Sequence, residues 1–189
     1  MVRSTLPLFA FALLASAPAL VAQPVALPQF RSVELHGGGT VLVAPGAAET
    51  VTIVQGSTQF TRMYVDNEGK LIIDACNEQC PRNYQLRVEV RSPVVPPLAV
   101  HGGGAITTVP GFAPQAQIAV AVRGGGKIDA RSVDAATVAA AVNGGGELLV
   151  RPRRSLAAAV NGGGNIRYWG NPSVSMAVRG GGAVTPEGY

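Results

Sequence analysis

The stretch Val142-Asn143-Gly144-Gly145-Gly146-Glu147-Leu148 contains the pattern on which the chain is built: an aliphatic residue, a polar residue, three glycines, a variable residue and a second aliphatic residue. Six such glycine triplets supply 18 of the 24 glycines. They begin at Gly37, Gly102, Gly124, Gly144, Gly162 and Gly180. From the second triplet onward the starts are 22, 20, 18 and 18 residues apart, which indicates a structural repeat rather than a flexible linker.

Apolar residues occupy three fixed positions around every triplet: four and two residues before its first glycine, and four residues after it. They are Val33, Leu35, Val41, Leu98, Val100, Ile106, Val120, Val122, Ile128, Ala140, Val142, Leu148, Ala158, Val160, Ile166, Met176, Val178 and Val184. This period of two is typical of strands with one buried face. A repeat of about 20 residues cannot bury that face alone and must stack on its neighbours. The pattern therefore predicts an all-β parallel β-helix or related solenoid.

The residues between these apolar positions should face outward in two columns. One column consists of Glu34, Ala99, Ala121, Ala141, Ala159 and Ala177; the other, directly before the glycines, consists of His36, His101, Arg123, Asn143, Asn161 and Arg179. Asparagine ladders stabilise stacked strands, so the second column could be purely structural. We also consider His101, Arg123, Asn143, Asn161 and Arg179 as a groove for an anionic or hydroxyl-rich polymer. The five alanines are a candidate partner or oligomer surface.

The first part of the chain is less regular. Short β-rich runs are expected at 33–35, 40–43, 50–54, 61–65, 70–74 and 84–90, separated by turn signals such as Asn67-Glu68-Gly69. Residues 23–29 form a proline-bearing lead-in, and prolines 93, 96 and 97 mark the join to the regular repeats of 98–186. Residues 30–189 are therefore expected to be a single domain, less regular over 30–97, in which the irregular strands of 50–91 cap one end.

Residues 1–22 have the layout of a secretory signal peptide, with Arg3, an apolar run, and small residues that permit cleavage after Ala19 or Ala22. The remaining chain would be exported to the periplasm, the outer surface or the medium. No other apolar run is long enough to cross a membrane. In an oxidising compartment Cys76 and Cys80 are expected to form a disulfide.

Several motifs resemble the head GIN domain family, which carries the name autotransporter adhesin. The resemblance covers about Phe30 to Pro186. It includes Phe30-Arg31-Ser32-Val33, the glycine repeats, and the segment Tyr168-Trp169-Gly170-Asn171-Pro172, which is similar to the family's closing aromatic-aromatic-Gly-Asn-Pro motif. The chain departs from the family by placing His, Arg or Asn where Ser is usual, and Gly where Ala is frequent. The resemblance implies a right-handed β-helix, export, and no known catalytic residues.

No catalytic motif accompanies these repeats. No serine lies in Gly-x-Ser-x-Gly, and the two histidines lack further ligands at zinc-binding spacing, so neither a metal site nor a cofactor is expected. An enzyme acting on acidic polysaccharide is the alternative by fold analogy. It would use a basic set for the sugar carboxylates and an acidic set as base or metal ligand. The basic set is Arg123, Lys127, Arg151, Arg153, Arg154, Arg167 and Arg179, and the acidic set is Asp129, Asp134 and Glu147.

The charge also limits the classes of partner. Without Arg3 the chain has 14 basic and 11 acidic residues, an excess too small to indicate nucleic-acid binding. The sequence thus predicts a non-enzymatic, adhesin-like binding module of the cell envelope, with a cell-surface glycan or envelope protein as partner. A structural envelope protein without a small ligand is the third possibility.

Overall fold

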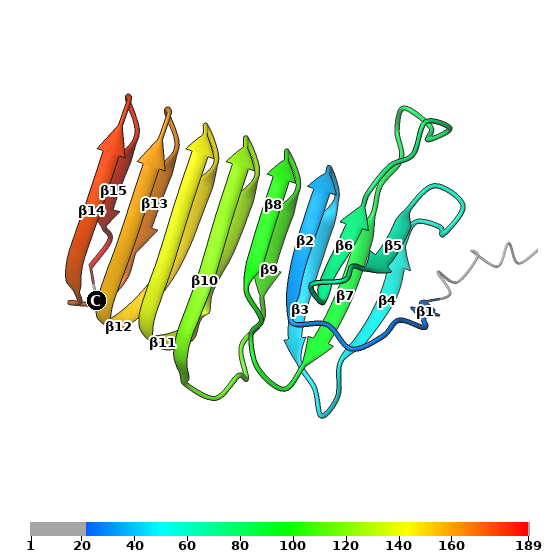
Figure 1. The fold of residues 1–189 in the computed structure, drawn as a ribbon, viewed down its shortest axis with the longest axis horizontal. Helices are drawn as coiled ribbons and strands as arrows, with labels where there is room; N and C mark the ends of the chain where they lie inside the picture. Colours follow the sequence, from blue (N-terminus) through cyan, green and yellow to red (C-terminus); the bar gives the residue numbers. More distant parts are fainter. Residues whose placement is uncertain (1–21, 189) are drawn as a thin grey trace, which may run out of the picture.

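The computed structural model describes residues 22–188 as an all-β fold, with no helix among them. The expected signal peptide lies outside the described residues except for Ala22. One strongly curled, mixed sheet contains 15 strands (Figure 1). The strands are β1 (Gln23–Val25), β2 (Ser32–Gly37), β3 (Thr40–Pro45), β4 (Thr50–Gln55), β5 (Arg62–Val65), β6 (Lys70–Asp74), β7 (Arg87–Ser92), β8 (Leu98–Gly102), β9 (Ala105–Thr108), β10 (Gln115–Gly124), β11 (Lys127–Gly144), β12 (Glu147–Asn161), β13 (Asn165–Tyr168), β14 (Ser173–Arg179) and β15 (Ala183–Pro186).

Parallel pairing arranges these strands in two columns. Column A runs β6, β2, β8, β10, β11, β12, β14, and column B runs β7, β3, β9, β11, β12, β13, β15. The long strands β11 and β12 belong to both columns, because the start of each pairs in column B and the remainder in column A. The triplets turn the chain from column A to column B at one edge of the molecule, the upper edge in Figure 1.

The two columns enclose one hydrophobic core, built largely from the apolar positions that recur around the triplets. Val122, Val142 and Ile166 are almost fully buried, as their period of two predicts. The last repeat differs: Met176 is 57% exposed and Val178 40% exposed. The expectation of burial is wrong there because, among residues 22–188, β14 pairs only with β12 and nothing covers its other side.

The glycine triplet is required by close packing of the turns. Gly144 has a φ of +121°, and a Cβ there would lie 2.6 Å from the carbonyl oxygen of Gly124 in the preceding repeat. A Cβ on Gly146 would lie 2.5 Å from the carbonyl oxygen of Gly126. A Cβ on Gly145 would meet nothing within 4 Å. The first and third positions therefore exclude side chains, whereas the middle position is sterically open.

The end of the sheet nearest the N-terminus finishes in antiparallel strands. In column A β5 pairs antiparallel with β6, and in column B β4 pairs antiparallel with β7 and with β1. The segment that follows β6 contains a disulfide between Cys76 and Cys80, whose Cα atoms are 5.5 Å apart, and this confirms the expected pairing. A closed loop of this kind fixes the chain between the two columns.

Candidate functional site

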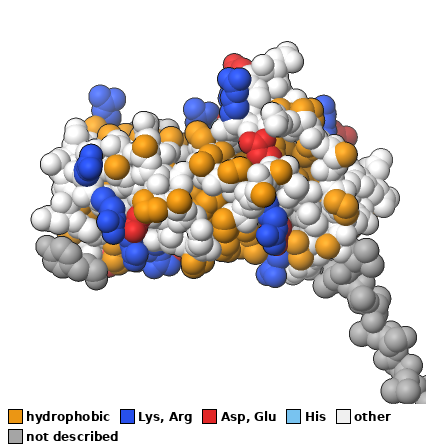
Figure 2. Space-filling view, turned by 90° about the horizontal axis from the view of Figure 1, so that it is seen from below, with side chains coloured by type: hydrophobic (Ala, Val, Ile, Leu, Met, Phe, Trp, Pro, Cys, Tyr) orange, Lys and Arg blue, Asp and Glu red, His pale blue; other side chains and the backbone are white. Residues whose placement is uncertain are grey.

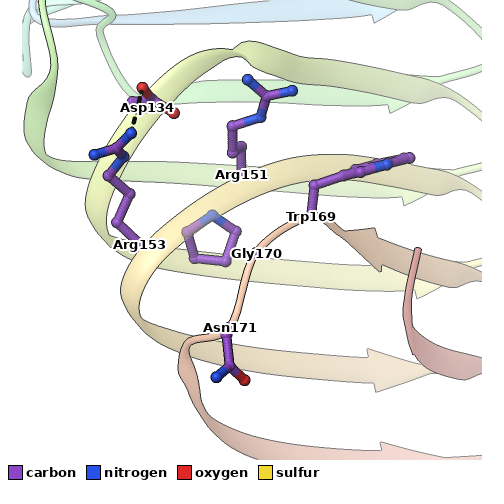
Figure 3. Close-up of a pocket in the computed structure, with 7 residues that line it drawn as sticks. Asp134, Arg151, Arg153, Trp169, Gly170 and Asn171 are labelled. Carbon is purple, nitrogen blue, oxygen red and sulfur yellow. Dashed lines mark ion pairs between the residues drawn. The ribbon is translucent and has the colours of Figure 1, made fainter. Parts of the chain in front are cut away.

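A groove lies at the edge opposite the glycine triplets, where the chain passes from column B to column A. We call it the Trp169 groove. It consists of two adjoining cavities of about 430 and 470 Å³ that share Arg151 and Trp169. The first is lined by Asp134, Arg151, Pro152, Arg153, Trp169, Gly170 and Asn171 (Figure 3), and the second adds Asp129, Arg131, Thr108 and their neighbours. In the view from below, Lys and Arg side chains stand among hydrophobic and a few acidic ones at this edge (Figure 2).

Successive repeats supply the walls of the groove, because strand register brings equivalent turns side by side. Asp134 of β11 is the register partner of Arg151 of β12. Trp169 follows β13, and its backbone N–H donates to the carbonyl oxygen of Val150 at 3.0 Å. Gly170 allows its backbone to lie close to that of Pro152 in the preceding repeat. Its φ is +114°, and a Cβ there would lie 2.8 Å from the carbonyl oxygen of Pro152. The backbone on both sides of Trp169 is thus fixed against the preceding repeat, and its side chain lines both cavities.

Arg131 joins the aromatic ring to an acidic group. Its Nε and Nη2 donate to the two carboxylate oxygens of Asp129 at 2.9 and 2.6 Å, and its Cζ lies 4.9 Å from the centroid of the Trp169 ring. Burial favours the neutral acid and raises the pKa of Asp129, but the hydrogen bonds from Arg131 outweigh it, so this pKa is below its usual range. Asp129 is therefore ionised at neutral pH and fixes a guanidinium over the indole face.

Arg151 and Arg153 differ in their pairing. Nη2 of Arg153 lies 3.2 Å from a carboxylate oxygen of Asp134, the pair marked by the dashed line in Figure 3. Among residues 22–188, Arg151 forms no ion pair, and Figure 3 shows its side chain extended between Asp134 and Trp169. Trp169 is half-buried. A guanidinium beside such a ring can bind a carboxylate or sulfate while the accessible part of the ring contacts an apolar surface of the same ligand.

The polar column expected from the sequence is one straight ladder in the structure, on the triplet edge. Each residue of the column is the register partner of the next one along the stack. The order is His36, His101, Arg123, Asn143, Asn161 and Arg179. Asp74 of β6 pairs with His36 and extends the row at its start. We call this row the polar ladder. The Trp169 groove lies at the opposite edge, where the chain passes from column B back to column A. The two candidate surfaces are therefore separate.

The ladder begins with a compact group of titratable side chains that sequence reasoning missed in part. The rings of His36 and His101 stack with centroids 4.7 Å apart. Glu34 and Asp74 flank them, with contacts of 3.4 and 3.3 Å to His36. Burial, and then repulsion from His36, lowers the pKa of His101 although Glu34 opposes the shift. The sequence could have indicated part of this group, because Glu34 and His36 are two residues apart on one strand and therefore share a face.

The alanine column also lies in register, with Ala99, Ala121, Ala141, Ala159 and Ala177 on successive strands of column A. A shallow, mainly alanine-lined concavity of about 680 Å³ runs beside it, over β2, β8, β10, β11 and β12. The alanines are half-buried in the middle of the column and exposed at Ala159 and Ala177. They form a smooth outer face of the sheet.

The remaining basic residues named for an acidic glycan do not gather in one place. Lys127 and Arg167 both pair with Glu147, at 2.7 and 3.4 Å. Arg123 and Arg179 lie on the polar ladder instead of the Trp169 groove. All three acids proposed for an enzyme, Asp129, Asp134 and Glu147, form ion pairs with neighbouring arginine or lysine. Sequence reasoning did not select Trp169 as a binding residue, although it is the one tryptophan of the chain and lies in the quoted family motif.

The fold is similar to that of solved protein structures. A crystal structure of a "putative adhesin" from Bacteroides fragilis is similar at a TM-score of 0.54 and 16% identity, over 88% of this chain and 96% of that one. A second, from Parabacteroides distasonis, has a TM-score of 0.42 and 16% identity over 88% and 96% of the two chains, too low for a fold argument. No curated protein matches. Within residues 22–188 there is no helix of the length and apolarity needed to cross a membrane.

The family comparison agrees with the motifs of the sequence. The model of the family described as "Putative auto-transporter adhesin, head GIN domain" matches residues 98–172. This segment runs from β8 to the turn after β13 and contains the Trp169 groove and four residues of the polar ladder: His101, Arg123, Asn143 and Asn161. The resemblance drawn from the glycine repeats and the aromatic-aromatic-Gly-Asn-Pro motif is thereby confirmed over residues 98–172, which are similar to the head GIN domain family.

Proposed function

We propose that the protein is a non-enzymatic, adhesin-like surface module that binds an acidic glycan in the Trp169 groove. The observation that carries this proposal is the juxtaposition of Trp169 with Arg151, a cation without an ion-pair partner among residues 22–188. Arg131 and Arg153 add positive charge, reduced by Asp129 and Asp134. An aromatic face beside guanidinium groups suits a sugar that carries carboxylates.

The proposal also covers the export, the domain organisation and the handedness of the fold. We take residues 1–22 to be a cleaved signal peptide and the rest to be one exported domain at the periplasmic or outer surface. The two parallel columns joined by glycine turns support a right-handed parallel β-helix, in which the antiparallel strands β1, β4 and β5 cap one end. The adhesin names of the family and of the similar B. fragilis structure are consistent with a surface role.

The acidic residues support binding rather than catalysis. A general base for polysaccharide cleavage needs a pKa raised toward neutrality and freedom to accept a proton. The pKa of Asp129 is lowered, and its oxygens accept hydrogen bonds from Arg131. Asp134 and Glu147 are likewise occupied by cations. The groove is therefore better suited to hold a polymer than to cleave it.

The test measures binding of polygalacturonate oligomers by titration calorimetry, with neutral dextran as the control ligand. Arg151→Ala should weaken binding about tenfold, since it removes a charge-assisted hydrogen bond, and Trp169→Ala should have a similar effect. Arg154→Ala is the matched control: it removes one exposed positive charge from the same strand, outside the groove lining, and should leave affinity nearly unchanged. Because the chain has one tryptophan, its fluorescence should also change on binding.

Other outcomes would replace the proposal. If Arg123→Ala with Arg179→Ala abolishes binding while Trp169→Ala does not, the ligand site is the polar ladder. Release of shortened or unsaturated sugars from polygalacturonate would identify an enzyme. If no acidic glycan binds across a glycan array, the structural alternative replaces the binding module.

A further inference from the structure

The two histidines of this chain, the only ones in its sequence, face each other across neighbouring strands. His36 on β2 and His101 on β8 are register partners, and their rings stack at 4.7 Å with an interplanar angle of 29°. They lie 65 positions apart in the chain, so the arrangement exists only because β2 and β8 pair in parallel. Imidazole is the commonest protein ligand of transition metals, so two imidazoles on neighbouring strands are candidate ligands for one ion.

The carboxylate of Glu34 lies close to both imidazole rings. Oε2 of Glu34 lies 3.4 Å from Nε2 of His36 and 3.7 Å from Nε2 of His101. One ligand atom from each of the three residues falls within 4.8 Å of the other two. Ligands at 2.0–2.1 Å around a tetrahedral zinc ion are separated by roughly 3.3 Å. The two separations from Glu34 are close to that value. A metal ion requires the two stacked imidazole rings to turn until both Nε2 lone pairs point at the same position beside Oε2 of Glu34.

The surroundings orient these ligands. In the structure Nε2 of His36 hydrogen-bonds with Oε2 of Glu34 at 3.4 Å, and Oδ1 of Asp74 lies 3.3 Å from Nδ1 on the other side of the ring. When Nε2 binds a metal ion, the imidazole proton moves to Nδ1, where Asp74 can accept it. A carboxylate behind a histidine ligand in this manner fixes the tautomer and makes the imidazole more basic. The other oxygen of Glu34, Oε1, lies 3.9 Å from Nζ of Lys70, which leaves Oε2 for the histidines.

Exposure and charge are compatible with an ion that remains open to solvent. The side chains of Glu34, His36 and His101 are 19%, 36% and 30% exposed. Two cations oppose a metal: Arg123, the next rung of the ladder, and Lys70, whose ammonium also pairs with Glu68 at 2.7 Å. The carboxylates of Glu34 and Asp74 offset these charges. A set of two histidines and one carboxylate with an open fourth position is common in zinc proteins.

We propose that Glu34, His36 and His101 bind a divalent transition-metal ion of the zinc class, with Asp74 as the positioning residue behind His36 and the fourth position open to water or ligand. The site is independent of the Trp169 groove, because the two lie at opposite edges of the sheet.

The direct test is a calorimetric titration of the full chain, purified without a polyhistidine tag, with Zn²⁺ at pH 7.5. We expect one ion per chain and a rise in the unfolding temperature that EDTA reverses. His101→Asn should weaken binding at least a hundredfold. This variant places on β8 the residue that the ladder has at Asn143 and Asn161, so the fold should be retained. Asp74→Asn should weaken binding about tenfold, and Asn143→Ala should leave it unchanged.

Two further measurements identify the ligands. Co²⁺ bound at the site should give the visible absorption of a four-coordinate nitrogen and oxygen complex, and His36→Ala should remove it. The Cys76→Ser/Cys80→Ser variant must still bind Zn²⁺, since a loss there would assign the metal to the thiols. The proposal is wrong if Zn²⁺ does not bind at millimolar concentration, or if His36→Ala and His101→Asn bind it as tightly as the parent chain. Trp169→Ala should not alter Zn²⁺ binding, so this test and that of the glycan site fail separately.

Discussion

At the scale of single residues, the three glycines of each triplet have different reasons to be glycine. From the second triplet onward, the first glycine combines a positive φ with contact to the preceding repeat, and the third approaches a backbone carbonyl of that repeat too closely for any side chain. The middle glycine has neither constraint, because its φ is not positive and the space around it is open. The tripeptide looks uniform in the sequence, but only its first and third positions require glycine for steric reasons. The middle position is free of that requirement.

This difference predicts opposite effects of two neighbouring substitutions. Gly146→Ala should destabilise the protein by about 3 kcal/mol, since a Cβ would overlap the backbone of the adjacent repeat. Gly145→Ala should be neutral or stabilising by about 0.5 kcal/mol, because alanine restricts the unfolded chain at no cost in the folded one. Urea unfolding of both variants measures the difference. Equal losses of stability would contradict the steric account.

At the scale of the strand, parallel register turns sequence columns into continuous surfaces. Each outward position of column A lies beside the equivalent position of the next strand, which produces the alanine face on one line and the polar ladder on another. A smooth face of small side chains can approach a second flat surface closely. We propose that this alanine face is where two copies of the chain, or the chain and an envelope partner, meet.

The proposal is tested with one substitution at the centre of the face. Ala141→Arg places a long, charged side chain between Ala121 and Ala159 and should dissociate any oligomer seen by light scattering, with little effect on the unfolding temperature. Thr137→Arg, also outward on β11 but nearer the opposite edge, is the control and should leave the mass unchanged. A parent chain that remains monomeric at high concentration rules the interface out.

At the scale of the whole molecule, the stack of repeats has two unlike ends. The N-terminal end finishes in antiparallel strands and a disulfide loop, whereas β14 and β15 each have one partner among the described residues (Figure 1). In such a stack each repeat is stabilised mainly by its immediate neighbours. The same aliphatic position therefore contributes differently in the interior and at the open end.

Two valines of one column measure this dependence on position. Val142 is 1% exposed between β10 and β12, and Val142→Ala should cost about 2 kcal/mol from lost burial and the cavity left behind. Val178 is 40% exposed in the last repeat, and Val178→Ala should cost less than about 1 kcal/mol. Chemical denaturation of the pair compares them directly. Equal costs would show that something outside the described residues covers the last repeat.

Much of the architecture was determined by the sequence alone, because it follows from the local alternation of apolar and outward-facing residues and from the regular spacing of the glycine triplets. The alternation around Val142 and Leu148 predicts strands and the buried face, the glycine spacing predicts the length of each repeat, and the cysteine spacing predicts the disulfide. The alignment of the triplets even predicts which outward residues form the polar ladder. A repeat protein allows this because each copy adopts the same local structure and meets the next copy in the same register.

Other features were decided only by the tertiary structure. The exposure of Met176 and Val178 depends on the absence of a neighbour beyond β14 among residues 22–188, which no local pattern records. The Trp169 groove joins turns from four repeats, and the Glu34, His36, His101 and Asp74 cluster joins strands β2, β6 and β8. Binding surfaces arise where side chains from separate segments converge, and convergence is a property of strand pairing across the fold rather than of spacing along the chain.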